Sequence, residues 1–226
     1  MNVPNGDTYA PAAPDPADDP ELTPEDSLAV IAAQQRLAQR RLELDPVHAY
    51  VPWGLAWLVG YALFFLRFGP DERVFISMPE WLPLTVLLVL LGLAGLVTGV
   101  AGHRAYRGVA GESSERGLMY GLAWAFATVG FIAIANRFEA HLPDPLAGLL
   151  WGALPVLVTA TLFMSGGAVW RDRQQFGLGV WLVAVLVVAL IAGPGWHSLV
   201  IAALGGGGFL SAAAVSAARR PRGTVT

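Results

Sequence analysis

Six apolar runs follow one another between residues 50 and 218, and each is close to the length that a helix needs to cross a membrane. The hydrocarbon core of a bilayer is about 30 Å thick, which an α-helix crosses in about 20 residues. Hydrocarbon offers the backbone no hydrogen-bonding partner, and the strands of a barrel would be about half as long with alternating polarity. The pattern therefore predicts an all-α membrane protein. The six predicted transmembrane helices, within a domain over residues 46–218, are 50–68, 81–102, 117–137, 145–169, 177–193 and 198–218.

The composition fits a membrane protein better than a soluble domain. Hydrophobic residues make up 55% of the 226 residues and charged residues only 14%, which is too apolar for a soluble domain of this length. The chain has no cysteine, which excludes disulfides, thiol catalysis, iron–sulfur clusters and cysteine-bound zinc. Its basic residues gather at the ends of the apolar runs and form no basic face. We therefore expect the lipid bilayer as a partner and no nucleic acid.

The region before the first apolar run divides into a tail and a helix. Residues 1–22 contain five prolines, several acids and no base, so we expect a disordered acidic tail. Residues 23–45 predict a cytoplasmic amphipathic helix, in which Thr23 suits the N-cap, Pro24 the first helical position and Pro46 the end. Its apolar face, spaced by three and four residues, carries Leu28, Ile31, Gln35, Ala38 and Leu42. We expect this face to lie on anionic headgroups; a coiled-coil contact with a protein partner is the alternative.

The positions of the arginines predict the orientation of the chain. With the N-terminus inside, 11 of the 14 arginines fall on the cytoplasmic side and only Arg67, Arg73 and Arg137 fall outside. This distribution follows the positive-inside rule, and most tryptophans lie near the ends of the apolar runs, as an aromatic belt requires. The sequence therefore predicts a multi-pass protein of the cell (plasma) membrane with both termini in the cytoplasm, the last eight residues, 219–226, forming a basic tail.

Two internal repeats compete as descriptions of the six spans. The first, third and fifth spans carry WGLAW at 53–57, YGLAW at 120–124 and, more loosely, GLGVW at 177–181, and the even-numbered spans end in small residues followed by arginines. This pattern favours three tandem helical hairpins. The alternative is an inverted repeat of three spans, which many transporters contain, because WGLAWLVGYALFF at 53–65 aligns with WGALPVLVTATLF at 151–163.

The segment SLAVIAAQQRLAQRRLELDPVHAYVPWGLAWLVGYALFFL, residues 27–66, resembles the opening of uncharacterised six-span integral membrane proteins of actinobacteria, some of which are labelled transport proteins. The hairpin pattern also resembles, more loosely, the acid-resistance membrane proteins of the HdeD type. These resemblances imply a six-span fold. They bring no established activity and no functional residue.

The sequence lacks the residue patterns of catalysis. No aspartate or glutamate lies inside a predicted span, and HExxH, GxSxG and P-loop motifs are missing, so we expect no enzyme, no cofactor and no metal. Glu139, His141, Asp144 and His197 could approach one another on the outer side, but their spacing matches no metal motif. The absence of acids within the spans also argues against an ion-driven pump.

The stretch ALGGGGFLS at 203–211 is the most unusual feature of the last apolar run. Each glycine costs a helix roughly 1 kcal/mol relative to alanine. A phosphate loop is excluded because no lysine follows, which leaves a packing seam or a hinge. At 1.5 Å per residue, the run and Pro155 of the fourth span reach a similar depth near the midplane. The candidate midplane packing or hinge residues are Pro155, Gly60, Thr128, Gly205, Gly206, Gly207 and Gly208.

Small residues four positions apart predict where helices pack closely. Such pairs occur at Gly95 and Gly99, at Gly117 and Gly121, at Gly148 and Gly152, and within the last span, and they let helix backbones touch in lipid. We therefore expect the sixth span to be a central helix held by its neighbours. The function that fits best is an accessory or structural membrane component without catalysis. The alternative is a small transporter or channel for a neutral or lipid-like solute, with its site near Pro155 and the glycine run.

Overall fold

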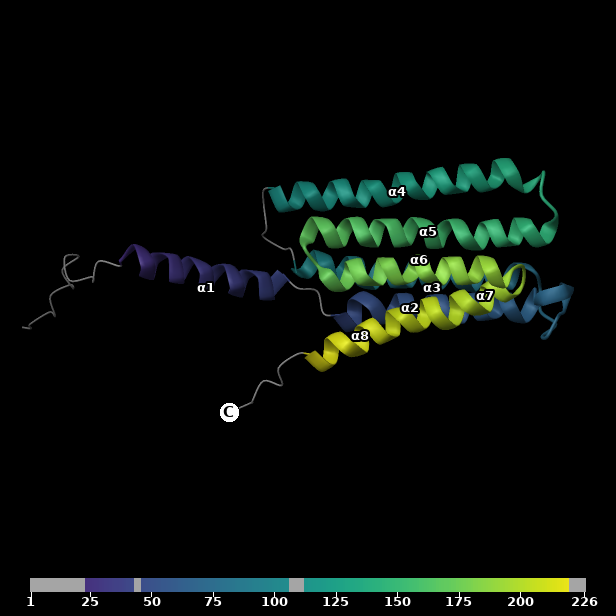
Figure 1. Ribbon diagram of the computed structural model, residues 1–226, viewed down its shortest axis with the longest axis horizontal. Helices are drawn as coiled ribbons and strands as arrows, with labels where there is room; N and C mark the ends of the chain where they lie inside the picture. The colour runs from purple at the N-terminus through teal and green to yellow at the C-terminus, as the bar shows by residue number, and fades with distance from the viewer. Residues whose placement is uncertain (1–22, 43–45, 106–111, 220–226) are drawn as a thin grey trace, which may run out of the picture. The chain divides into compact units, whose positions relative to one another are not determined.

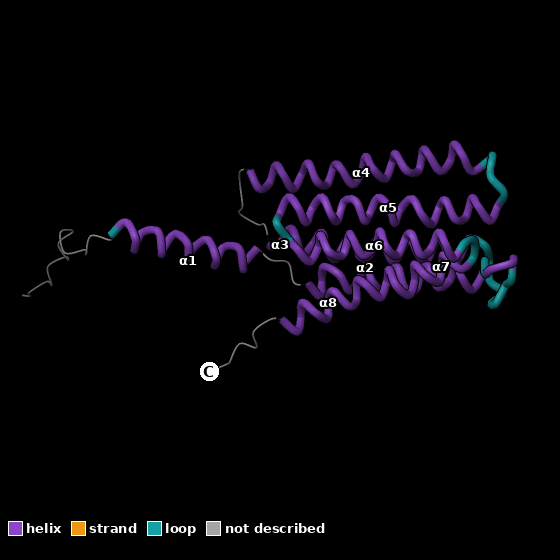
Figure 2. Tube along the Cα trace, in the orientation of Figure 1, coloured by secondary structure: helices purple, strands orange, loops and turns teal. Residues whose placement is uncertain are grey.

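The computed structural model describes residues 23–42, 46–105 and 112–219, and the regular structure within these ranges is entirely helical (Figures 1 and 2). Six helical spans are long and apolar enough to cross a membrane, which confirms the predicted all-α, multi-pass architecture. The first five spans are α2 (Pro46–Arg67), α3 (Trp81–Ala105), α4 (Glu112–Glu139), α5 (Asp144–Trp170) and α6 (Arg173–Ala192). The sixth span consists of α7 (Trp196–Val200), the π-helical turn η3 (Ile201–Gly206) and α8 (Gly207–Arg219).

The observed helices extend beyond most of the predicted ends. The first span begins at Pro46 and not at residue 50, because proline fits the first turn of a helix, where its missing N–H leaves no hydrogen bond unmade. The fifth span begins at Arg173, four residues before the predicted start, because the Asp172 carboxylate caps it by accepting from the backbone N–H groups of Gln174 and Gln175. Polar residues at its ends can thus extend a helix beyond the apolar run from which the helix was predicted.

The N-terminal helix α1 (Pro24–Leu42) forms a unit of its own. Thr23 caps it as predicted: its Oγ1 accepts from the backbone N–H of Asp26 at 3.2 Å and donates to the Asp26 carboxylate at 2.7 Å. Leu28 and Ile31 are 66% and 50% exposed, so this part of the apolar face packs on nothing within the unit. The predicted tails, 1–22 and most of 219–226, lie outside the described residues.

The membrane domain has an inner group of helices and two outer ones, α3 and α4. Helix α2 packs against α3 on one side and against α7, η3 and α8 on the other, while α5 packs between α4 and α6. All three predicted hairpin pairs are in contact, but so are α5 with α6 and α2 with α8, which the hairpin repeat does not pair. The tandem repeat therefore stays a prediction, as does the inverted repeat.

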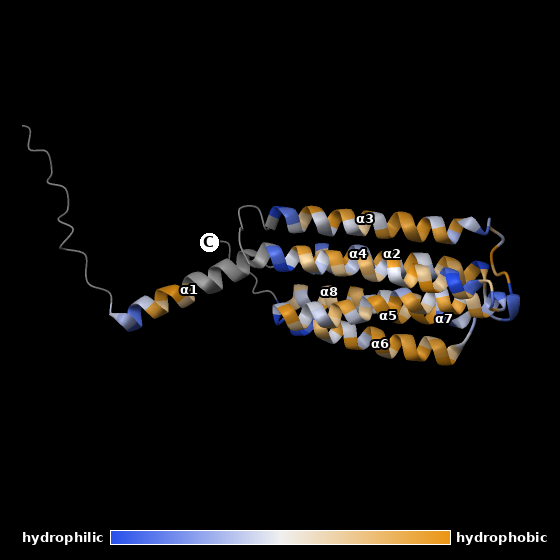
Figure 3. Ribbon diagram, turned by 90° about the horizontal axis from the view of Figure 1, so that it is seen from above, coloured by the Kyte–Doolittle hydropathy of each residue, from blue (hydrophilic) through white to orange (hydrophobic). Residues whose placement is uncertain are grey.

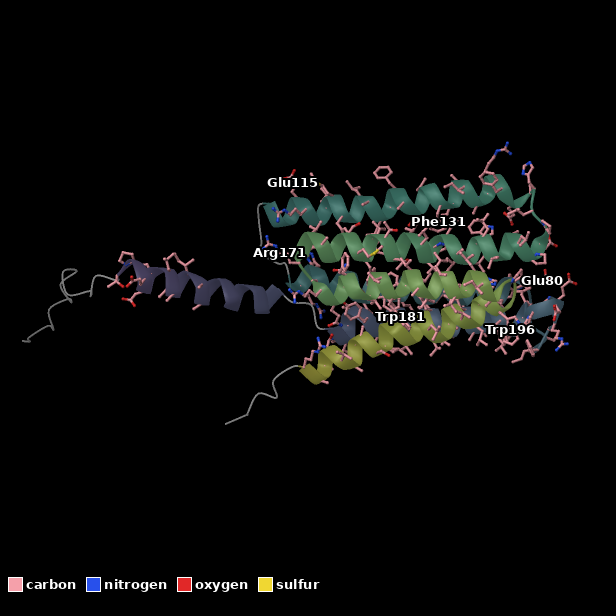
Figure 4. The ribbon with its side chains drawn as sticks, in the orientation of Figure 1. Glu80, Glu115, Phe131, Arg171, Trp181 and Trp196 are labelled. Atoms are coloured by element: carbon pink, nitrogen blue, oxygen red, sulfur yellow. The ribbon has the colours of Figure 1, made fainter. Side chains whose placement is uncertain are left out.

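Most of the apolar surface faces outward. Apolar residues cover the middle of the helices and hydrophilic residues lie at their ends (Figure 3). Only 6% of the α4 span and 11% of the α3 span are buried within the protein, against 39% of the sixth span. Figure 4 shows Glu115 and Arg171 at one end of the bundle and Glu80 and Trp196 at the other. Such a surface is suited to lipid, and it identifies α3 and α4 as the peripheral spans.

The core of the bundle is an aromatic row that joins four helices. The ring of Phe209 in α8 lies 5.4 Å from that of Trp57 in α2 and 5.5 Å from that of Phe163 in α5. The Phe163 ring lies 6.2 Å from Trp124 in α4. Phe209 is fully buried, and its contacts with both neighbouring rings are edge-to-face, the arrangement that the aromatic quadrupole favours. The last residues of WGLAW and YGLAW, Trp57 and Trp124, thus mark the two ends of this row.

Candidate functional site

The glycine run lies in a continuous helix, and a π turn precedes its second half. The π-helical residues Ile201–Gly206 include the first two glycines, and Gly207 begins α8. A π turn widens the helix by one residue and is found mostly as single turns, frequently at functional sites. The run is therefore neither a loop nor an ordinary stretch of α-helix.

Gly205 and Gly206 allow the sixth span to lie directly on α2. A β-carbon on Gly206 would lie 2.7 Å from the backbone nitrogen of Leu58 and 2.9 Å from the carbonyl oxygen of Gly54. A β-carbon on Gly205 would lie 2.9 Å from the ring of Trp57. Real β-carbons are not found so close to backbone atoms. These two positions thus form a packing seam in which the missing side chains decide how near the helices come.

Gly208 faces a different helix. A β-carbon there would lie 2.5 Å from the indole Nε1 of Trp181 in α6. That indole N–H donates a hydrogen bond of 2.9 Å to the carbonyl oxygen of Leu204, inside the π turn, and Figure 4 shows Trp181 where α6 meets α8. Carbonyl groups of a widened turn lose regular helical geometry, so a side-chain donor at this depth stabilises the turn. Gly207, in contrast, has no atom within 4 Å of the position that a β-carbon would take.

The other predicted site residues are spread over three helices, α2, α4 and α5. Gly60 of α2 packs on Leu87 of α3, with 2.5 Å between its would-be β-carbon and Leu87 Cδ1. Pro155 is half-buried within α5, whose helix continues through it, and its neighbour Val156 belongs to the same buried cluster as Phe209. Thr128 is half-buried on the peripheral helix α4. The closest contacts of the glycine run are thus with α2 and α6, and none is with Pro155.

Several of the predicted small-residue contacts are wrong for this chain's own helices. Gly95, Gly99, Gly117 and Gly121 would all accept a β-carbon without meeting an atom within 4 Å, so they face away from the bundle. In the Gly148 and Gly152 pair, Gly152 alone packs closely, against His197. The spacing identified residues that share a helix face, but it could not say whether that face meets a helix or lipid.

His197 is a functional candidate that could not be identified from the sequence. The sequence places it beside the start of the last span, and in the structure it is only 7% exposed. A β-carbon on Gly152 would lie 2.8 Å from its Cδ2, so the missing side chain makes room for the ring. Its Nε2 lies 3.2 Å from the Ser198 hydroxyl, while its Nδ1 is buried without a hydrogen-bond partner. No local pattern announces such a residue, because burial depends on the packing of α5 on α7.

The outer acidic and histidine residues do not assemble. Within the described ranges, no group of three or more histidine, aspartate or glutamate side chains could hold a metal ion. Glu139, His141 and Asp144 are exposed, whereas His197 is buried. The paired charge in that region is instead Arg67, whose guanidinium lies 2.8 Å from the Glu80 carboxylate and donates to the carbonyl of Met78. This pair fixes the loop that joins α2 and α3.

Polar side chains tie the helices together at the opposite end. The amide of Gln174 at the start of α6 donates to the carbonyl of Ala212, and its oxygen accepts from Ser216 at 2.6 Å, both in α8. The next residue, Gln175, reaches the other way and donates to the hydroxyl of Tyr120 in α4. Tyr120 in turn donates to the carbonyl of Leu162 at 2.7 Å. Two adjacent glutamines thus connect the start of α6 to α8 on one side and to α4 on the other.

Comparison with known proteins does not add an identity to this geometry: no protein-family model, no curated protein and no solved structure matches the chain.

Proposed function

We propose that this protein is an accessory or structural component of a membrane, without catalysis, in which the glycine run holds the sixth span against α2 and α6. The observation that supports this most is the set of close backbone contacts at Gly206, where α2 occupies the place that a side chain would take. The two cavities described for the bundle lie elsewhere, next to His103 in α3 and Phe176 in α6. Helices that pack directly on one another at the glycine run leave no room there for a solute, as we expect of a structural protein.

The proposal includes an orientation and a membrane. The end of the bundle at which α2 begins carries the described arginines Arg104, Arg116, Arg171, Arg173 and Arg219, more than lie at the opposite end. This excess favours a cytoplasmic location for that end of the bundle. Both termini then lie in the cytoplasm of a plasma membrane. The exposed apolar residues Leu28 and Ile31 of α1 support a contact with headgroups or a protein partner there. The resemblance of residues 27–66 to actinobacterial six-span proteins agrees with this assignment.

The alternative is a small carrier for a neutral or lipid-like solute, and two observations favour it. The π turn Ile201–Gly206 includes the first two glycines of the run, and such turns are frequent at functional sites. Eight residues before Gly205, His197 is buried near the start of the same span with an unpartnered nitrogen. Ionisable groups within membrane spans usually mark a pathway. In this alternative the seam opens during transport.

Labelling of single cysteines separates the two proposals, because the natural chain has none. Gly207→Cys places a thiol inside the glycine run without a clash. The scaffold proposal predicts that membrane-impermeant maleimide fails to reach this thiol from either side. Exposed end positions serve as controls: Arg73→Cys should react in intact cells, and His103→Cys only in inverted vesicles. Reaction of the Gly207→Cys thiol from alternate sides would support the carrier, and reversed labelling of the two controls would overturn the orientation.

A further inference from the structure

A groove runs along the outward face of α3 and ends at two basic side chains. It has a volume of about 460 Å³ and is lined by Gly95, Leu96, Gly99, Val100, His103 and Arg104. The two glycines form its floor, because neither would bring a β-carbon within 4 Å of another atom. The groove is thus apolar along most of its length and cationic at one end.

A neighbouring face of α3 is fixed to the bundle, which leaves the groove turned outward. The indole N–H of Trp53 in α2 donates to the Thr98 hydroxyl at 3.0 Å, and that hydroxyl donates to the carbonyl of Ala94. Ala94 is 1% exposed. Residues 95 and 99 lie one position further around the helix from these anchors. The groove is therefore a permanent feature of the surface that lipid contacts.

The depth of the groove matches a lipid and its headgroup. Arg104 lies one residue before the end of a 25-residue helix, a length that exceeds the ~20 residues needed to cross hydrocarbon, so its guanidinium reaches the headgroup layer. Gly95 lies nine residues earlier, which is about 14 Å deeper along the helix axis. Arg104 makes no ion pair or hydrogen bond with any described side chain. Its charge is available to an anion from outside the chain.

We propose that this groove binds an anionic phospholipid, with one acyl chain along Gly95 and Gly99 and the phosphate at Arg104 and His103. Charge and polarity favour this occupant over a second copy of the chain. Two copies inserted in the same direction would bring their Arg104 side chains together at the same depth, where like charges repel. A phospholipid instead places its negative group at the cationic end and its hydrocarbon on the glycines.

Native mass spectrometry of the full-length protein, reconstituted with equal amounts of phosphatidylglycerol and phosphatidylcholine, tests this proposal. We expect the wild-type protein to retain phosphatidylglycerol about five-fold better, the ratio that corresponds to ~1 kcal/mol for one arginine at an anionic surface. Arg104→Gln should bring the ratio close to one, and the matched Arg219→Gln at the end of α8 should leave it unchanged. Gly99→Leu should reduce retention of both lipids by filling the groove.

Gly130→Leu is the control for the last variant, because Gly130 of α4 also has no atom within 4 Å of its would-be β-carbon but lies outside the groove. Equal retention of the two lipids by the wild-type protein would overturn the proposal. So would an equal effect of Arg219→Gln, which would indicate general surface attraction. If Gly99→Leu leaves lipid retention intact and converts a dimer to a monomer, the occupant is a helix of another copy and the lipid proposal is wrong.

Discussion

Replacing Phe209 with alanine should lower the free energy of unfolding by about 4 kcal/mol. Phe209 is fully buried, and its ring packs edge-on against both Trp57 and Phe163. Its removal leaves a cavity between α2, α5 and α8 and also removes two aromatic contacts worth ~1 kcal/mol each. In lipid, where no hydrophobic effect draws helices together, this packing is the main source of stability.

The matched control is Phe126→Ala on α4, because Phe126 is 72% exposed. Lipid replaces the contacts of an exposed ring, so this variant should change the free energy of unfolding by less than about 0.5 kcal/mol. Both variants can be measured by titration with SDS in mixed micelles, with tryptophan fluorescence as the signal. Similar losses in the two variants would mean that the aromatic row does not form the core.

Gly206→Ala should destabilise the protein by about 2 kcal/mol relative to Gly207→Ala. Both substitutions remove a glycine from the same helical segment, so both gain a comparable ~1 kcal/mol of helix propensity. At Gly206 the added methyl group would lie within 3.0 Å of three backbone atoms of α2, whereas at Gly207 it would meet none within 4 Å. Backbone cannot move aside as a flexible side chain can. The two helices must therefore separate.

The comparison of these two neighbours isolates the packing of the seam from every effect of glycine on the helix itself. The same SDS titration, together with melting temperatures in detergent, gives the difference. If Gly207→Ala destabilises the protein as much as Gly206→Ala, the run acts through backbone flexibility, as a hinge would, and close packing is not its role.

The number and positions of the spans could be predicted from the sequence, because each span needs an apolar run long enough to cross the hydrocarbon layer. Each of the six apolar runs became a span, with ends displaced by a few residues where polar groups such as Asp172 cap a helix. The cap at Thr23 was also predictable, since the interaction is local. In contrast, the partners of each helix could not be predicted. A soluble helix reveals its inner face by its polarity, but here lipid and protein are equally apolar, so the helix faces look alike.

The candidate site shows the same limit in single residues. The glycine run was visible as a departure from helix propensity, but only the arrangement of α2 and α6 separates Gly206, which touches backbone, from Gly207, which touches nothing. The carbonyl of Leu204 in the π turn accepts a hydrogen bond from Trp181, a residue 23 positions earlier in another helix. The burial of His197 could not be predicted, because it depends on a missing side chain at Gly152, 45 residues earlier. The different surroundings of Gly206 and Gly207, the contact at the π turn and the burial of His197 all depend on packing between helices that are far apart in sequence.

Disulfide formation between Gly54→Cys and Leu210→Cys tests most directly whether the glycine run closes a seam between α2 and α8. A β-carbon on Gly54 would lie 2.8 Å from Leu210 Cγ, in direct contact with that side chain. Positions this close are candidates for a disulfide, which needs a separation of about 3.5–4.5 Å between β-carbons. The chain has no natural cysteine to compete. We expect this pair to form a disulfide rapidly and nearly completely under mild oxidation in native membranes, and Gly54→Cys with Ser211→Cys, one residue further around α8, to react much less. Failure of the first pair, or equal reaction of both, would contradict the closed seam.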